Sequence, residues 1–145
     1  MRARSPTHQA ALSYARRGVP TFPCVPGGKR PITAHGYEDA SSDPARIDGW
    51  FAREPNANLA LPTGLRSGFL VLDVDAKRGV DGRATVAAFE RTLGPLPATL
   101  TSATPSGGEH RWFRAPARVV RCSVGRLAGE GAPGLDVRGD GGYVV

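Results

Sequence analysis

Two aspartates separated by one residue follow an apolar run at residues 69–75, and their spacing suits them to binding a metal ion. The run predicts a buried strand that ends in Asp73 and Asp75. Alternate side chains of a strand share a face, so the two carboxylates lie together, with Cα atoms about 6.5 Å apart. Like charges this close repel each other in a half-buried site unless a cation lies between them. Mg²⁺ or Mn²⁺ meets that need, and solvated or capped aspartates are the alternative interpretation.

A second polar segment, residues 104–110, combines a serine, two glycines and a histidine. Ser106 and the glycines predict a tight turn whose backbone N–H groups can face an anion. His110 begins the strand that follows, where it can hold a phosphate oxygen or a metal ion. The alternative is an ordinary polar residue at the start of a strand.

A third segment, residues 135–138, offers another carboxylate within a predicted strand. Asp136 and Arg138 lie two residues apart and therefore share a face. Asp140, in the glycine-rich stretch that follows, fits a turn-forming role better than a ligand role. Lys29 lies in a glycine-containing loop, but the Walker pattern of a phosphate-binding loop is absent because Arg30 replaces its serine or threonine.

The bulk properties describe a globular protein with one domain of ordinary size. The chain has 145 residues, of which 40% are hydrophobic and 22% charged. With no long apolar run and no signal peptide pattern, we expect a cytoplasmic protein without a membrane partner. Cys24 and Cys122 have no metal-type spacing and are expected to be reduced. The net charge of +6 fits a nucleic-acid or nucleotide partner, although a GC-rich coding bias, which favours Arg, Ala and Gly, explains it equally well.

Helical and strand patterns alternate along the chain. Caps and periodicity predict helices that begin at Ser5-Pro6, at Asp43-Pro44 and at Asp81. Strands are expected at residues 19–25, 58–61, 69–75, 99–104, 111–113, 119–124, 135–138 and 143–145. This mixture predicts an α+β fold with a mixed or largely antiparallel sheet. Because the chain ends within a predicted strand, we expect a domain truncated at its C-terminus.

Taken in order, these segments resemble the bifunctional DNA primase/polymerase N-terminal domain (Prim-Pol) of the archaeo-eukaryotic primase superfamily. That family has a strand ending in two acidic residues, then a serine–histidine motif, then a late apolar–aspartate motif. Residues 72–75, 104–110 and 134–145 match these three motifs, and weaker matches lie at residues 29–31, 43–50 and 58–64. The resemblance runs from about residue 8 to the last residue. Several ordered motifs at compatible spacing are more specific than any one of them.

The resemblance implies a fold and a metal site. The fold would be an RRM-like primase-polymerase core joined to a smaller N-terminal α/β unit, with residues 1–145 forming a single catalytic domain. Asp73, Asp75 and Asp136 would hold two divalent ions, Mg²⁺ or Mn²⁺, at the catalytic centre.

The resemblance also implies substrates and partners. His110, counted among the catalytic residues, and Ser106 would bind the triphosphate of an incoming (d)NTP. We add Arg138 and Lys29 as further phosphate or template contacts. The partners would be a DNA template and primer, and a replicative helicase as a domain or a separate protein.

Three functions compete on these observations. The first is template-dependent nucleotidyl transfer in DNA replication, by priming or by primer extension. The second is a non-catalytic nucleic-acid or nucleotide-binding remnant of a replication protein, which the expected truncation favours and the intact acidic residues oppose. The third is a metal-dependent nuclease, which would prefer clustered histidines or a catalytic tyrosine, whereas the three histidines here (His8, His35 and His110) are scattered.

Overall fold

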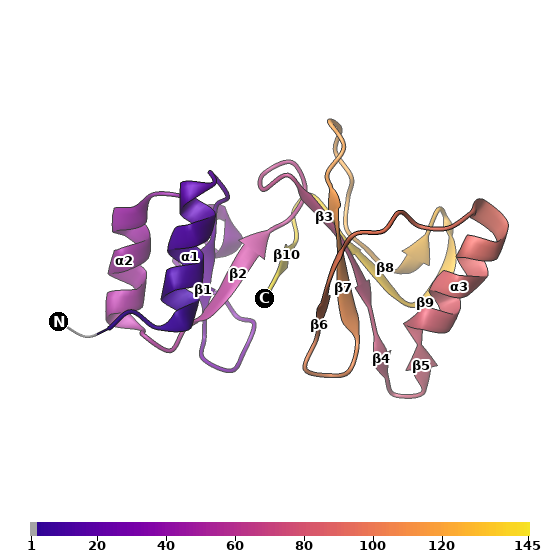
Figure 1. Cartoon of the computed structure of the whole chain (residues 1–145), viewed down its shortest axis with the longest axis horizontal. Coiled ribbons are helices and arrows are strands. Elements are labelled where there is room, and N and C mark those ends of the chain that lie inside the picture. The colour runs from indigo at the N-terminus through magenta and orange to yellow at the C-terminus, as the bar shows by residue number, and fades with distance from the viewer. Residues whose placement is uncertain (1–2) are drawn as a thin grey trace. The chain divides into compact units, whose positions relative to one another are not determined.

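The computed structural model describes residues 3–145 and divides them into two units (Figure 1). The first unit extends to Pro62 and includes the last residues, Gly142–Val145, while the second is Thr63–Gly141. All pairs of named strands are antiparallel, so the α+β class with antiparallel sheets is confirmed, and the RRM-like core remains a prediction. Within residues 3–145, no helix has the length and apolar character needed to cross a bilayer.

The two helices of the first unit begin where their capping residues predict. Helix α1 (Pro6–Arg16) follows Ser5, whose Oγ accepts a hydrogen bond from the backbone N–H of His8 at 3.3 Å. Helix α2 (Pro44–Arg53) follows Asp43, whose Oδ1 accepts from a backbone N–H at 3.0 Å. Each helix also has proline in its first turn, where a missing N–H costs nothing.

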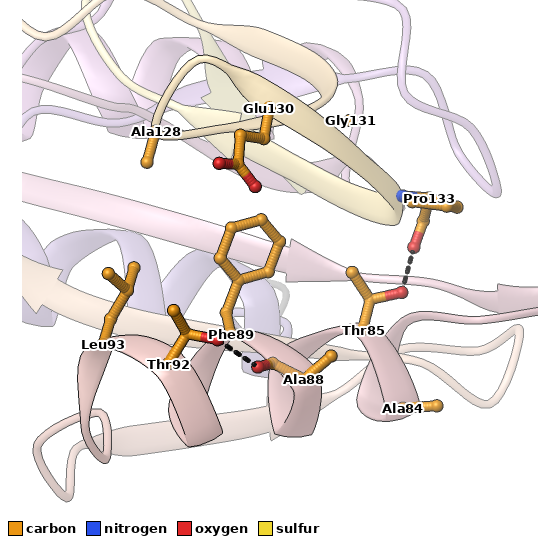
Figure 2. Close-up of a pocket in the computed structure, with 10 residues that line it drawn as sticks. All are labelled: Ala84, Thr85, Ala88, Phe89, Thr92, Leu93, Ala128, Glu130, Gly131 and Pro133. Carbon is orange, nitrogen blue, oxygen red and sulfur yellow. Dashed lines mark hydrogen bonds between the residues drawn. The ribbon is translucent and has the colours of Figure 1, made fainter.

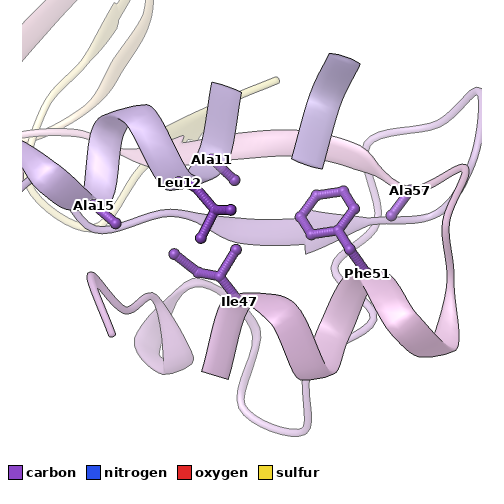
Figure 3. Close-up of a cluster of buried hydrophobic side chains, with 6 residues drawn as sticks. All are labelled: Ala11, Leu12, Ala15, Ile47, Phe51 and Ala57. Atoms are coloured by element: carbon purple, nitrogen blue, oxygen red, sulfur yellow. The ribbon is translucent and has the colours of Figure 1, made fainter. Parts of the chain in front are cut away.

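The core of the first unit lies between these helices and a three-stranded sheet (Figure 3). The sheet has the order β1 (Phe22–Cys24), β2 (Asn58–Pro62), β10 (Tyr143–Val144). A short 3-10 helix, η1 (Gly36–Asp39), lies in the connection between β1 and α2. The main hydrophobic cluster consists of Ala11, Leu12, Ala15, Ile47, Phe51 and Ala57.

The second unit is built on a five-stranded antiparallel sheet with helix α3 (Gly82–Leu93) on one face. In spatial order the strands are β6 (Leu100–Ala103), β7 (Glu109–Arg114), β3 (Phe69–Val74), β9 (Glu130–Arg138) and β8 (Ser123–Leu127). Val86 of α3 packs on Leu72 and Val74 of β3 and on Leu135 of β9. The helix therefore covers the face of the sheet to which the even-numbered residues of β3 point.

The structure departs from the sequence-based expectation in two connections. The strand expected at residues 119–124 is wrong, because β8 begins only at Ser123 and is paired by a hairpin with the start of β9. An unpredicted hairpin, β4 (Ala76–Lys77) and β5 (Val80–Asp81), precedes α3. Arg78 and Gly79 both have positive φ, the backbone that a tight two-residue hairpin turn requires.

Asp140 ties two loops of the second unit together, which confirms its structural role. Its Oδ1 accepts from the N–H of Leu65 and its Oδ2 from the N–H of Val120, both at 2.9 Å. These two N–H groups lower the pKa of the Asp140 carboxyl below its usual value. The neighbouring Gly64 has φ +81°, and a Cβ there would lie 2.5 Å from the Asp140 carboxylate. The ionised Asp140 side chain thus holds the loops that contain Leu65 and Val120 together.

Truncation of Ile47, which is fully buried between α1 and α2, tests the core of the first unit. We expect Ile47→Ala to lower the free energy of unfolding by about 2–5 kcal/mol, because the lost side chain leaves a cavity. Ile47→Val removes a single methyl group and should cost only about 0.5–1.5 kcal/mol. Urea unfolding followed by circular dichroism measures both, and equal losses would contradict the assignment.

Replacement of Asp140 by asparagine tests the pKa shift. Because the folded-state pKa is lowered, Asp140 stabilises the fold above the usual carboxyl pKa of about 3.9, and this is lost as pH falls through the lowered value. Asp140→Asn removes the charge and one acceptor, so we expect a lower Tm at pH 7 and a smaller difference from wild type near pH 2. Thermal melts between pH 2 and pH 7 measure this. A difference in Tm that stays constant over the range would contradict the role.

Candidate functional site

A row of polar side chains, called here the carboxylate row, crosses the five-stranded sheet on the face opposite α3. Asp73 of β3 is paired by register with His110 of β7 on one side and with Asp136 of β9 on the other. Ser102 of β6 extends the row, because it is paired with His110. Directly opposed residues of antiparallel strands have neighbouring side chains on one face. The sheet thus brings together three residues that are far apart in the sequence.

Asp73 is at the centre of the row and lies near two cationic or ionisable groups. Its Oδ1 is 3.6 Å from Nε2 of His110, and its Oδ2 is 3.6 Å from Nη2 of Arg138. The side chains of Asp73 and His110 are only 14% and 10% exposed. The predicted grouping of Asp73, His110, Asp136 and Arg138 is therefore present in the second unit.

Asp136 is held by its own strand and by β8. Its Oδ2 accepts a hydrogen bond from Nη2 of Arg138 at 2.9 Å, and its Oδ1 accepts from the N–H of Gly125 at 3.1 Å. Gly125 has φ +62° and lies where the register between β8 and β9 shifts. Such bulges often redirect groups beside functional sites. Sequence reasoning missed Gly125, because the location of β8 was not predictable.

A second irregularity turns Asp136 toward Asp73. Ala132 and Leu135 of β9 both pack in the cluster beneath α3, although an odd separation puts residues of a regular strand on opposite faces. Gly134, between them, has φ +77°, which changes the phase of the strand. Asp136 therefore faces away from α3.

Asp75 lies just past β3 and is fixed through its backbone. Its N–H donates to the carbonyl of Gly134 and its carbonyl accepts from the N–H of Gly82, both at 2.8 Å. A Cβ on Gly82 would lie 2.5 Å from the Gly134 oxygen, so the close approach of these two backbone segments requires glycine at position 82. The Asp75 carboxylate is 2.9 Å from Nζ of Lys77. Asp75 is thus only two residues from Asp73 of the carboxylate row, while its own carboxylate pairs with Lys77.

Ser106 lies in the turn between β6 and β7, where its Oγ is 3.3 Å from Oγ1 of Thr104. The backbone of Thr104 closes the turn by donating to the carbonyl of Gly108. Gly108 packs against β3, since a Cβ there would lie 2.4 Å from the carbonyl oxygen of Val74. The turn is thus held against the end of β3 next to Asp75, and the phosphate-binding role of Ser106 stays a prediction.

Lys29 lies in the first unit, in the loop that follows β1, and so belongs to a different unit from the carboxylate row. Its carbonyl oxygen accepts from Sγ of Cys24 at 3.3 Å and from the hydroxyl of Tyr143 at 3.1 Å. These contacts organise the loop through its backbone. A phosphate or template contact by the Lys29 side chain stays a prediction.

Trp112 is a residue of this face that sequence reasoning missed. Its Nε1–H donates to Oγ of Ser102 at 3.0 Å, and its ring meets those of His110 and Phe69 edge-on, with centroids 6.2 and 5.7 Å away. The sequence could have indicated Trp112, because a residue two positions after His110 in a strand shares its face. An aromatic surface therefore adjoins the carboxylate row.

Figure 2 shows a pocket lined by α3. Because α3 packs on the face of the sheet opposite the row, the pocket lies away from the row. It has a volume of about 660 Å³ and lies between α3 and the hairpin of β8 and β9. Phe89 projects into it, and Thr85 donates to the carbonyl of Pro133 at 2.7 Å across its end. None of the candidate residues lines this pocket.

The donor chemistry of the row suits a hard divalent ion. The Oδ2 atoms of Asp73 and Asp136 both face one cationic group, the Arg138 guanidinium, and carboxylate oxygens are the ligands that Mg²⁺ and Mn²⁺ prefer. Across residues 3–145, no three Asp, Glu, His or Cys side chains are grouped as metal ligands. The three-carboxylate set of Asp73, Asp75 and Asp136 stays a prediction.

The site is thus one face of an antiparallel sheet that carries opposed carboxylates, a histidine and an arginine. Comparison with family models is more specific. The model described as bifunctional DNA primase/polymerase, N-terminal (Prim-Pol), matches residues 11–145, and the chain belongs to this family. Curated proteins gave no match to the chain.

Substitution of Gly108 by alanine tests the contact between the serine-containing turn and β3. The added methyl group would meet the carbonyl oxygen of Val74, so we expect a loss of about 1–3 kcal/mol in the free energy of unfolding. Gly131 is the matched control, since a Cβ there meets nothing within 4 Å, and Gly131→Ala should change stability by less than about 0.5 kcal/mol. Chemical denaturation measures both, and similar losses would contradict the close packing.

Proposed function

We propose that the chain is a DNA primase/polymerase domain. It transfers nucleotidyl groups from (d)NTPs to a primer 3′-hydroxyl, or to an initiating nucleotide, on a DNA template. The observation that carries this proposal is the register of β3, which in a chain of this family sets Asp73 beside both His110 and Asp136. In the transfer, the 3′-oxygen bonds to the α-phosphorus, and pyrophosphate leaves as the bond to the bridging oxygen breaks.

The acidic residues supply the ligands that such a reaction needs. Asp73 and Asp136, with Asp75 at the end of the same strand, would hold two Mg²⁺ or Mn²⁺ ions. Bound there, the ions would lower the pKa of the attacking hydroxyl and neutralise the leaving pyrophosphate. Because both carboxylates of the row are less than one-sixth exposed, the charge they contribute is weakly screened by water.

The remaining residues would bind the substrate. His110 adjoins Asp73 in the row and would contact the triphosphate together with Ser106 in the preceding turn. Arg138 and Lys29 would contribute further contacts to phosphates of the nucleotide or the template. The net charge of +6 supports a DNA template and primer held through their phosphates, with binding that weakens as salt rises. A replicative helicase is the proposed protein partner.

Primer extension tests the proposal directly. We expect the full chain to extend a labelled primer on a DNA template with dNTPs and Mn²⁺ or Mg²⁺. Asp73→Ala should reduce the rate at least about a hundredfold, because it removes a ligand from the centre of the row, and the Asp73→Ala/Asp75→Ala double variant should be inactive. Glu130→Gln is the control, since Glu130 lines the pocket beneath α3 and should leave the rate unchanged.

Two results would contradict the proposal. Extension by Asp73→Ala at a rate close to wild type would exclude the proposed metal ligands. No extension by the folded wild-type chain, together with retained binding of nucleotide or DNA, would indicate the non-catalytic binding remnant instead. Circular dichroism of each variant establishes that the fold is intact.

A further inference from the structure

Two members of the carboxylate row face each other, with the guanidinium of Arg138 between them. Asp73 and Asp136 are directly opposed on β3 and β9, an arrangement in which like charges destabilise a sheet. Nη2 of Arg138 lies 2.9 Å from Oδ2 of Asp136 and 3.6 Å from Oδ2 of Asp73. The guanidinium therefore offsets a repulsion that the register of the sheet imposes.

The other carboxylate oxygens have different neighbours. Oδ1 of Asp73 faces His110, and Oδ1 of Asp136 accepts from the N–H of Gly125. The two Oδ2 atoms are the pair that a cation lying between the strands would contact, and both are near Arg138. A divalent ion held by Asp73 and Asp136 would thus meet the guanidinium at the same oxygens.

We propose that Arg138 is an internal counter-ion that holds the metal-free site together and must leave the carboxylates when a divalent ion binds. This inference rests on the proposed function, since it concerns the same metal site. Arg138 is the last residue of β9, and its side chain is 32% exposed, about twice as much as those of its two partners. Its long side chain can turn away without a change in the backbone.

The exchange has a thermodynamic consequence. A tethered cation at the ligand oxygens competes with the metal ion, so part of the binding free energy of the metal is spent on displacing Arg138. Removing the guanidinium should lower the stability of the metal-free protein, because no cation then lies between the Oδ2 atoms of the two opposed carboxylates. It should also strengthen metal binding. A guanidinium that only stabilises the fold would produce the first effect without the second.

The sheet provides a matched control on its other face. Arg111 of β7 pairs with Glu109, two residues earlier on the same strand, at 2.7 Å, as Arg138 pairs with Asp136. Arg111 is paired by register with Leu72, so it lies on the α3 side of the sheet. Arg111→Gln thus makes the same chemical change as Arg138→Gln, away from the carboxylate row.

Mn²⁺ titration of the full chain tests the inference, with free Mn²⁺ measured by electron paramagnetic resonance. We expect Arg138→Gln to bind Mn²⁺ about tenfold more tightly than wild type, which corresponds to about 1.4 kcal/mol. Its Tm without metal should be lower than that of wild type, and its rise in Tm with Mn²⁺ should be larger. Arg111→Gln should have the Mn²⁺ affinity of wild type.

A second measurement uses the wild-type side chain and does not depend on the folding of Arg138→Gln. Arg138→Lys identifies the ¹H–¹⁵N guanidinium signal of Arg138 by its loss. Titration with Mg²⁺ should then shift that signal in the wild-type protein and leave the signal of Arg111 in place. An Arg138 signal that is unchanged at saturating Mg²⁺ would overturn the inference.

The outcomes separate this inference from the proposed function. If Mn²⁺ binds wild type and not Asp73→Ala, and Arg138→Gln binds no more tightly than wild type, the counter-ion inference fails and the metal site stands. If wild type shows no binding of Mn²⁺ that depends on Asp73, the metal site itself fails, and with it both proposals.

Discussion

The pairing of β3 with its two neighbours is the constraint on which the rest of the second unit depends. His110, Asp73 and Asp136 come from three separate strands, and they meet only because each lies opposite the next. A slip of one residue in either pairing would move a member of the row to the α3 face, away from the other members and toward the apolar cluster. Correct register therefore stabilises the core and assembles the candidate site at the same time.

Three glycines, at irregular points of the backbone, allow this register to place the polar side chains correctly. Gly134 changes the phase of β9, so that Leu135 stays in the core while Asp136 turns to the other face. Gly125 directs its N–H at the Asp136 carboxylate, and Gly108 allows the turn before β7 to approach β3. Each of these glycines solves a local steric or hydrogen-bonding problem that a regular strand would leave. The charged residues of the site thus depend on neighbours that carry no side chain.

Local signals in the sequence predicted the parts of the fold that are determined locally. Ser5, Asp43 and Asp81 begin helices because their side chains accept from backbone N–H groups nearby, and this chemistry is readable from a few residues. The apolar run before Asp73 likewise predicted a buried strand. These assignments needed no knowledge of distant partners.

Properties that depend on distant partners could not be predicted. The location of β8 depends on its pairing with β9, which no local pattern encodes. The role of Gly125 could not be predicted either, because Gly125 lies at the register shift of this pairing. Spacing alone placed Asp75 beside Asp73, whereas Lys77 holds the Asp75 carboxylate in the structure. The contact between Arg138 and two aspartates follows from strand register, which only the assembled sheet defines.

The two cysteines differ in a way that matters for chemical labelling. Cys24 is fully buried, and burial raises its pKa to about 11, so only about one thiol in ten thousand is ionised at pH 7. Cys122 is exposed and lies just before β8, with its Sγ accepting from the N–H of Gly139. A thiol-directed reagent at neutral pH therefore distinguishes the two positions. The native chain carries a selective attachment point for a fluorophore or spin label on the unit that contains the carboxylate row.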